Sequence, residues 1–218
     1  MQRVQQAYAS RAQSDYLFSF WTALGWTLLT CGIYGLYVTY QLVRRSRDHN
    51  RRRLELLEAA TALAWDRATA AGRAEELRPN FERTATGLNA LRVMTADFRD
   101  PAIWTVIVAA AGYFTGIGGI VVHIILYCLL DQDLVKHDAA ERAIEAELAG
   151  IYGALGTSVP MPAGAPKQPH SYGGRVVATI FSLGFYTLWW EYNIMTEGNA
   201  HFEGNWVWED DLRASLGG

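Results

Sequence analysis

Two ionisable side chains stand inside long, otherwise apolar stretches of this sequence. His123 lies within residues 101–130, which contain no Asp, Glu, Lys or Arg, and Glu191 is the single acidic residue of 175–195. Ionisable groups at such depth in a membrane segment are functional candidates and tend to pair with one another. We therefore predict a candidate intramembrane polar site formed by His123 and Glu191. Alternatively, Glu191 lies close enough to its segment end to sit at the membrane interface and bond to a neighbour.

The other histidines offer weaker candidates. Three of them follow apolar segments directly: His49, His137 and His201. Haem ligation needs histidines that face each other at membrane depth, so we expect no haem. One group has the residue types of a metal site: His137 with Asp131, Asp133 and Asp138. Acidic residues at a membrane exit are more often simply solvated, so we predict no metal and no cofactor.

The sequence contains no recognisable catalytic motif. A Gly-rich phosphate loop, HExxH, CxxC and a Ser-His-Asp grouping are all missing from it. The two cysteines, Cys31 and Cys128, lie within apolar segments, where they behave as small hydrophobes. The net charge of −3 argues against nucleic-acid binding. We therefore predict a non-enzymatic protein.

Three apolar segments must position these residues. Half of the chain is hydrophobic and only 19% is charged, against about 25% charged in an ordinary globular protein. A helix needs about 20 apolar residues to span a bilayer. The predicted organisation is a polar tail 1–16, membrane segment 17–43, basic amphipathic helices 44–100, Gly-rich membrane segment 101–130, acidic helix and Pro-rich linker 131–174, membrane segment 175–195 and tail 196–218. We therefore predict an all-α integral membrane protein whose apolar segments are joined by amphipathic polar helices.

The way these segments meet the membrane stays open. An arginine cluster beside the first segment places 44–100 in the cytoplasm and could also face anionic lipids: Arg44, Arg45, Arg47, Arg51, Arg52 and Arg53. Three simple spans would put 1–16 and 131–174 outside and the C-terminus inside. The first two segments are longer than a span requires and contain internal glycines, so they could instead form re-entrant hairpins.

Small and aromatic residues suggest packing surfaces. Five glycines are candidates for close helix packing: Gly32, Gly35, Gly112, Gly116 and Gly184. Trp206 and Trp208, beside three acidic residues of the C-terminal tail, suit either an interfacial anchor or a partner-docking patch.

An internal repeat relates the outer segments. A shift of 152 residues aligns 27–49 with 179–201 and gives six identities in 23 positions, among them Gly32/Gly184 and His49/His201. The middle segment lacks the Gly-apolar-Tyr core, although its exit also runs from a tyrosine to a histidine. If that exit is equivalent, all three exits share one side, which favours hairpins.

The run Thr-Cys-Gly-Ile-Tyr-Gly-Leu-Tyr at 30–37, followed by Tyr40 and a basic exit with Asn50, resembles the signature of the domain-of-unknown-function 4234 family. The third segment resembles it in part, at 184–190, and the second departs from it. The resemblance implies residence in a bacterial membrane and no established activity.

The expected function is therefore that of a structural or accessory subunit of the bacterial inner membrane. It would be multi-pass, with 44–100 in the cytoplasm, and would pack in the lipid bilayer as a homo-oligomer or with other membrane subunits. The alternative is a small channel or transport component whose polar path is lined by His123 and Glu191.

Overall fold

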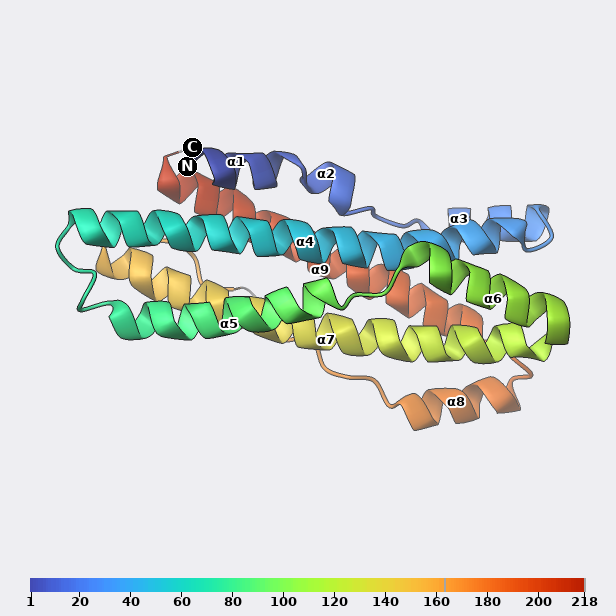
Figure 1. Cartoon of the computed structure of the whole chain (residues 1–218). Helices are drawn as coiled ribbons and strands as arrows, with labels where there is room; N and C mark the ends of the chain where they lie inside the picture. Colours follow the sequence, from blue (N-terminus) through green and yellow to red (C-terminus); the bar gives the residue numbers. More distant parts are fainter. Residues whose placement is uncertain (163, 218) are drawn as a thin grey trace.

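The computed structural model describes residues 1–162 and 164–217, and these contain helices without strands (Figure 1). The helices are α1 (Gln2–Ala9), α2 (Arg11–Ser14), α3 (Phe20–Leu29), α4 (Ile33–Ala70), α5 (Arg78–Ala96), α6 (Pro101–Thr115), α7 (Ile117–Ala154), α8 (Tyr172–Phe181) and α9 (Tyr186–Leu216). The all-α part of the predicted fold class is confirmed.

Each apolar segment folds as a short helix, a tight turn and a long helix. The pairs are α3–α4, α6–α7 and α8–α9. The long helices run along the molecule, and the three turns lie at one end, which we call the hairpin end (Figure 1). Both chain termini lie at the opposite end, here the terminal end. The three segments are thus helical hairpins rather than single continuous helices.

The first and third turns have the same local geometry. In turns 30–32 and 182–184 the backbone φ is 52° and 51° at the second residue, and 93° at both Gly32 and Gly184. The first residue of each turn accepts, through its side-chain oxygen, a hydrogen bond from the N–H four residues later, at 2.9 and 2.8 Å. A φ of 93° favours glycine strongly, because an L side chain is strained there. These glycines therefore make the turns.

The glycines of the second hairpin act differently. Gly116 forms its turn with φ 60°, and a Cβ added to Gly119 would lie 3.0 Å from the Cα of Gly112. The backbones of α6 and α7 can approach this closely only because neither residue has a side chain. In the first hairpin, Gly35 packs against Thr27 of α3, where a Cβ would meet Cγ2 at 3.3 Å. Of the predicted packing glycines, Gly35 and Gly112 thus pack closely within their hairpins, whereas Gly32, Gly116 and Gly184 form the turns.

The polar segments form one body. Helix α1 packs against α4 and α9, and Tyr8 donates a hydrogen bond to Asp210 at 2.7 Å. Arg83 of α5 contacts Glu147 of α7 at 2.6 Å. The three-span arrangement is therefore wrong for this fold, because it would place these contacting segments on opposite sides of a membrane.

Among the described helices, α7 alone is long and apolar enough to cross a membrane, while α3 and α6 are shorter apolar helices. One such helix is weak support for a membrane protein, since the core helix of a soluble protein passes the same test. The gathering of the three hairpin turns at one end is a further feature that bears on membrane association.

Two apolar cores lie along the bundle. The core at the hairpin end contains Val38, Leu42, Leu126 and Trp190 among others, and the core at the terminal end is built around residues such as Leu57, Ala60, Leu148 and Leu212. Between them lies a polar layer of buried or nearly buried side chains: Asp15, His49, Arg52, Arg53, His137, Asp138, Glu141, Glu145, His201, Asn205 and Glu209. The polar layer thus interrupts the core of the bundle midway.

Replacing Gly32 with alanine should destabilise the protein by about 1–2 kcal/mol, because the new Cβ is strained at φ 93°. Gly25→Ala is the matched control, since Gly25 lies inside α3 and both positions have open space around a new Cβ. The control should be neutral or slightly stabilising. Thermal unfolding in detergent measures both variants, and equal melting temperatures would contradict the assigned turn.

Candidate functional site

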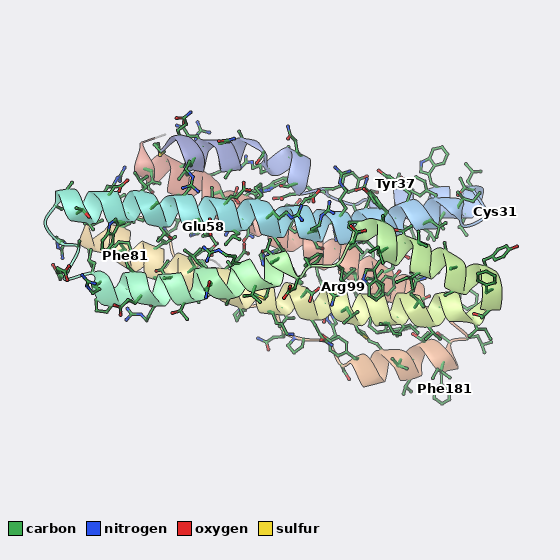
Figure 2. All side chains as sticks on the ribbon, in the orientation of Figure 1. Cys31, Tyr37, Glu58, Phe81, Arg99 and Phe181 are labelled. Carbon is green, nitrogen blue, oxygen red and sulfur yellow. The ribbon has the colours of Figure 1, made fainter. Side chains whose placement is uncertain are left out.

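The hairpin end exposes large apolar side chains. The most exposed are Tyr113 (86%), Phe114 (79%), Phe181 (86%), Leu183 (88%) and Phe185 (76%). These five residues belong to the second and third turns and their flanking helices. In the first hairpin, Trp21, Leu29 and Ile33 are similarly exposed. In Figure 2, Cys31 and Phe181, from the first and third hairpins, both lie at this end. In water such a surface would be unfavourable, so it marks a contact with lipid or protein.

The predicted polar site lies within this end. His123 and Glu191 line one cavity of about 230 Å³, together with Thr27, Tyr127 and Thr187. Nδ1 of His123 lies 2.9 Å from the Gly119 carbonyl oxygen and therefore carries the proton. The structure thus brings the two predicted residues to one cavity, although no direct hydrogen bond between them is among the described contacts.

The arginine cluster divides into exposed and buried members. Arg44 and Arg51 are exposed and Arg47 is half-buried. Arg45, Arg52 and Arg53 are buried, so the prediction that these three face lipid is wrong. The reason is helical periodicity, because these positions share the inward face of α4 with His49. Within that face, the guanidinium of Arg45 donates to the Asn199 side chain at 2.8 Å and to the carbonyl oxygen of Ile194 at 3.0 Å.

Arg53 occupies the middle of the polar layer. Its guanidinium donates to Glu141 at 2.7 Å and to Glu209 at 3.0 Å, and it also contacts Glu145. Glu141 and Glu145 belong to α7 and Glu209 to α9, so this one side chain links all three long helices. Five donors in a planar fork suit arginine to such multiple pairing.

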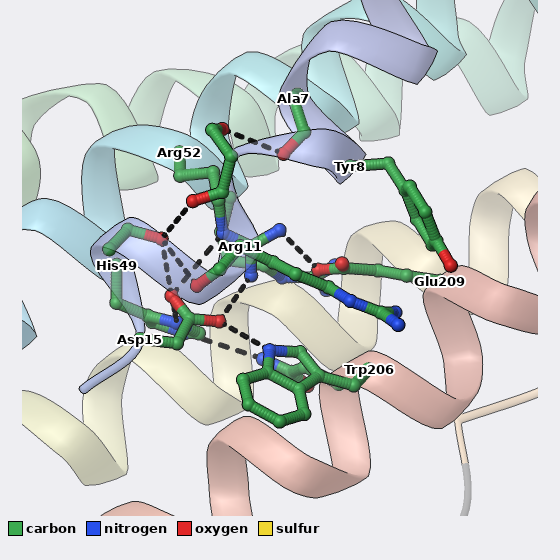
Figure 3. A network of polar contacts seen from close by, with 12 residues as sticks. Ala7, Tyr8, Arg11, Asp15, His49, Arg52, Trp206 and Glu209 are labelled. Carbon is green, nitrogen blue, oxygen red and sulfur yellow. Dashed lines mark hydrogen bonds and ion pairs between the residues drawn. The ribbon is translucent and has the colours of Figure 1, made fainter. Parts of the chain in front are cut away.

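Asp15 organises the neighbouring part of the layer (Figure 3). It accepts hydrogen bonds from Arg52 at 2.6 Å, from Nδ1 of His49 at 3.0 Å and from the indole of Trp206 at 2.7 Å. Burial opposes ionisation of Asp15, but His49 and Arg52 outweigh it and hold the pKa of Asp15 below its ordinary value. The loop before α3 is thereby tied to α4 and α9.

The tryptophans of the C-terminal tail are engaged inside the protein. Trp208 is 4% exposed, and its indole donates to the Pro160 carbonyl oxygen at 3.0 Å. Trp206 is half-buried against Asp15. The prediction of a partner-docking patch is therefore wrong for Trp208, because the linker after α7 already covers it.

Three histidines converge in the polar layer, one from each long helix. The ring centroids of His49, His137 and His201 lie 5.5, 5.2 and 5.9 Å apart. Each histidine and the nearby Glu141 offers one ligand atom. These four atoms lie within 4.8 Å of one another. This arrangement has the residue types and the spacing to hold a metal ion.

Two of these histidines, His49 and His201, differ in basicity. Burial lowers the pKa of His49 to about 3, despite its contact with Asp15. Burial also opposes protonation of His201, but hydrogen bonds to Asp138 and Glu141 raise its pKa to about 9. Without an ion in the layer, His201 is therefore the protonated member of this pair.

The convergence was not predicted from the sequence, although the repeat contained a signal for it. His49 and His201 occupy equivalent repeat positions, each 17 residues after its turn glycine, Gly32 or Gly184. Equivalent positions on two hairpins that share an end must lie at a similar height in the bundle.

The aspartates that were grouped with His137 in the sequence have other partners. Asp131 contacts Lys167 and His170, and Asp133 contacts Arg99. Asp138 contacts His201 and Arg142. That particular grouping is therefore not assembled.

Arg53→Met should cost about 3–5 kcal/mol of folding free energy, because it leaves three buried carboxylates without their common partner. Arg83→Met is the matched control, since the Arg83–Glu147 pair lies at the surface, and it should change stability little. Chemical unfolding in a mild detergent compares the two. A small effect at Arg53 would show that the layer does not hold the helices together.

Comparison with known proteins adds a family but no activity. The family model described as "Domain of unknown function (DUF4234)" matches residues 18–127, which include the first hairpin and much of the second. No curated protein and no solved structure matches the chain. The resemblance seen in the first apolar segment is thereby confirmed, and the chain belongs to the DUF4234 family.

Proposed function

We propose that this protein is a non-catalytic bacterial membrane protein that embeds its hairpin end in one leaflet and acts as a structural or accessory subunit. The observation that carries this proposal is the gathering of three apolar hairpin turns at one end, with large apolar side chains exposed around them. The bundle at the terminal end, with its charged surface, would stand in the aqueous phase.

The lengths of the short helices support insertion into half of a bilayer. Helices α3 and α8 have 10 residues and α6 has 15, or about 15 to 22 Å at 1.5 Å per residue. Half of the hydrocarbon core is about 15 Å thick, so the lengths of α3 and α8 match one leaflet, while α6 is longer. Turns at this depth are tolerated only if their backbone groups are satisfied within the protein. The N–H groups of Gly32 and Gly184 meet this requirement, each with a carbonyl oxygen at 2.8 Å.

The proposed side is the cytoplasm. Arg44, Arg47 and Arg51 remain at or near the surface where α4 leaves the hairpin end, and basic flanks stay on the cytoplasmic side. Because 1–16, 44–100 and the C-terminal tail form one body, all of them would share that side. The protein would then be inserted from one face of the inner membrane rather than multi-pass.

The bilayer is the first partner of the hairpin end, and packing with copies of the chain or with other membrane subunits is the second. The transport alternative has one specific observation in its favour, the cavity shared by His123 and Glu191. Hairpins that reach one leaflet give no complete path across the membrane, which makes transport the second candidate. Leucine substitutions at both residues that abolish ion flux without changing assembly would favour the transport alternative.

Sidedness tests the proposal directly. In a background with Cys31 and Cys128 replaced by serine, single cysteines at the exposed positions Gln5, Ser158 and Asp211 should all resist an impermeant maleimide in intact cells. All three should react in inside-out vesicles. Restoring Cys31 alone is the control, since that thiol is exposed at the first turn yet should react only after the membrane is dissolved. Labelling of Ser158→Cys from outside would contradict one-sided insertion.

Phe181→Asp should weaken membrane association, because a carboxylate near the bilayer centre costs about 2.5–3.5 kcal/mol. Val207→Asp is the matched control, because it places the same charge at an exposed apolar residue on the C-terminal half of α9. Flotation with vesicles of phosphatidylethanolamine and phosphatidylglycerol measures both variants. Equal retention on the vesicles would argue that the hairpin end does not enter the lipid.

A further inference from the structure

The centre of the polar layer is built from equivalent parts of the three hairpins. His49, His137 and His201 lie on α4, α7 and α9, and their rings form a nearly equilateral triangle with centroids 5.2 to 5.9 Å apart. The exposed fraction is 1% for His49, 2% for His137 and 6% for the side chain of His201. Solvent is thus nearly excluded from all three rings.

The orientation of two rings is set by carboxylates on their far side. Nδ1 of His49 lies 3.0 Å from Asp15, and Nδ1 of His201 lies 3.3 Å from Asp138. With Nδ1 of His49 donating its proton to Asp15, Nε2 of His49 presents a lone pair to the centre of the layer. Nε2 of the protonated His201 lies 3.3 Å from Oε2 of Glu141 and would present a lone pair there once an arriving ion displaces its proton. A carboxylate behind a histidine in this way is typical of metal-binding histidines, because it fixes both the tautomer and the ring angle.

Three of the side-chain atoms at the centre of the layer surround the Asn205 amide. The side-chain nitrogen of Asn205 lies 3.4 Å from Nε2 of His49, 3.3 Å from Nε2 of His201 and 3.0 Å from Oε2 of Glu141. These atoms are close enough together to share one cation. Binding would displace the proton of His201 and move the Asn205 amide aside.

His137 is the independent indication of a missing ligand. Its ring is 2% exposed, and neither Nδ1 nor Nε2 has a hydrogen-bond partner. Nε2 lies 3.1 Å from Oε1 of Glu141 but without the geometry of a hydrogen bond. Burying an unpartnered imidazole is unfavourable, and coordination of an ion would remove this cost.

The charges in direct contact also favour a cation. Arg52 and Arg53 together contact four carboxylates: Asp15, Glu141, Glu145 and Glu209. Asp138 is paired separately with Arg142 at 3.0 Å. With all four carboxylates ionised and His201 protonated by its contact with Glu141, this contact group carries one excess negative charge. A divalent ion that displaces the His201 proton would add one net positive charge and neutralise it.

We propose that His49, His137, His201 and Glu141 bind one divalent transition-metal ion. Three imidazoles and a carboxylate suit zinc and the neighbouring iron, cobalt and nickel ions better than magnesium or calcium, which prefer oxygen ligands. Ligand atoms in a tetrahedral site with bonds of about 2.1 Å lie about 3.4 Å apart. The present limit of 4.8 Å therefore requires side-chain shifts of about 1 Å.

A cavity of about 320 Å³ borders the site and is lined by residues that include Glu141, His201, Asn205 and Lys167. It would let the ion reach Glu141 and His201 past the linker between α7 and α8. An entry path is one of the requirements of a genuine metal site.

The test uses the full-length protein, purified in detergent and stripped with a chelator, so it does not depend on how the hairpins insert. Titration with Co²⁺ and Zn²⁺ should show one saturable site, with visible cobalt absorption and a rise in melting temperature. His137→Leu should raise the dissociation constant about 100-fold or more. It should still fold without metal, because the imidazole makes no hydrogen bond that leucine would remove.

His170→Leu and His123→Leu are the matched controls, since both residues lie outside the layer, and both variants should bind cobalt as the wild type does. His170 also belongs to a second possible group with Asp131 and Glu197. Cobalt binding that survives His137→Leu, or is lost only in His170→Leu, would overturn the proposal.

X-ray absorption of the zinc-loaded wild type needs no variant and keeps the proposal testable if His137→Leu fails to fold. Imidazole and oxygen ligands without sulfur are expected. Sulfur ligands from Cys31 or Cys128, or no saturable binding at all, would refute it.

Discussion

The architecture depends on a single buried guanidinium. Arg53 contacts carboxylates on α7 and α9 from its place on α4, and its own side chain is fully buried. Apolar cores alone allow long helices to slide past one another with little loss, since many apolar contacts are interchangeable. A charged group with three fixed partners allows only one register. The polar layer therefore sets the relative heights of the long helices, and with them the alignment of the three turns.

That alignment separates two environments along one bundle. Counted from the turns, His49 and His201 lie about 25 Å along their helices at 1.5 Å per residue, beyond the reach of the short helices. The part of the bundle that holds the apolar core of the hairpin end would thus lie in the lipid. The charged side chains of the polar layer, which would be very costly in hydrocarbon, would lie inside the protein just outside the hydrocarbon core.

Much of this could be predicted from the sequence. Uncharged length identified the three apolar segments, and Gly32 and Gly184 marked equivalent positions of a repeat. The length and glycine content of these segments could not distinguish spans from hairpins, because long, glycine-containing apolar segments can form either. Counting charges grouped Arg45, Arg52 and Arg53 with their exposed neighbours. The buried and exposed arginines differ only in the face of α4 on which they lie, which a charge count does not show. The histidine triangle also needs His137 of α7, which follows Gly116 by 21 residues rather than 17. Because this spacing differs from that of His49 and His201, the triangle could not be predicted from the repeat.

The placement of the termini has a practical consequence. Both lie together at the end remote from the turns (Figure 1), and Tyr8 and Arg11 near the start of the chain both bind Asp210 near its end. A fused reporter or an adjoining domain at either terminus would extend away from the hairpin end and leave it free. Chain ends this close also suit a circular permutation, in which the old termini are joined and new ones are opened in the linker that precedes α8.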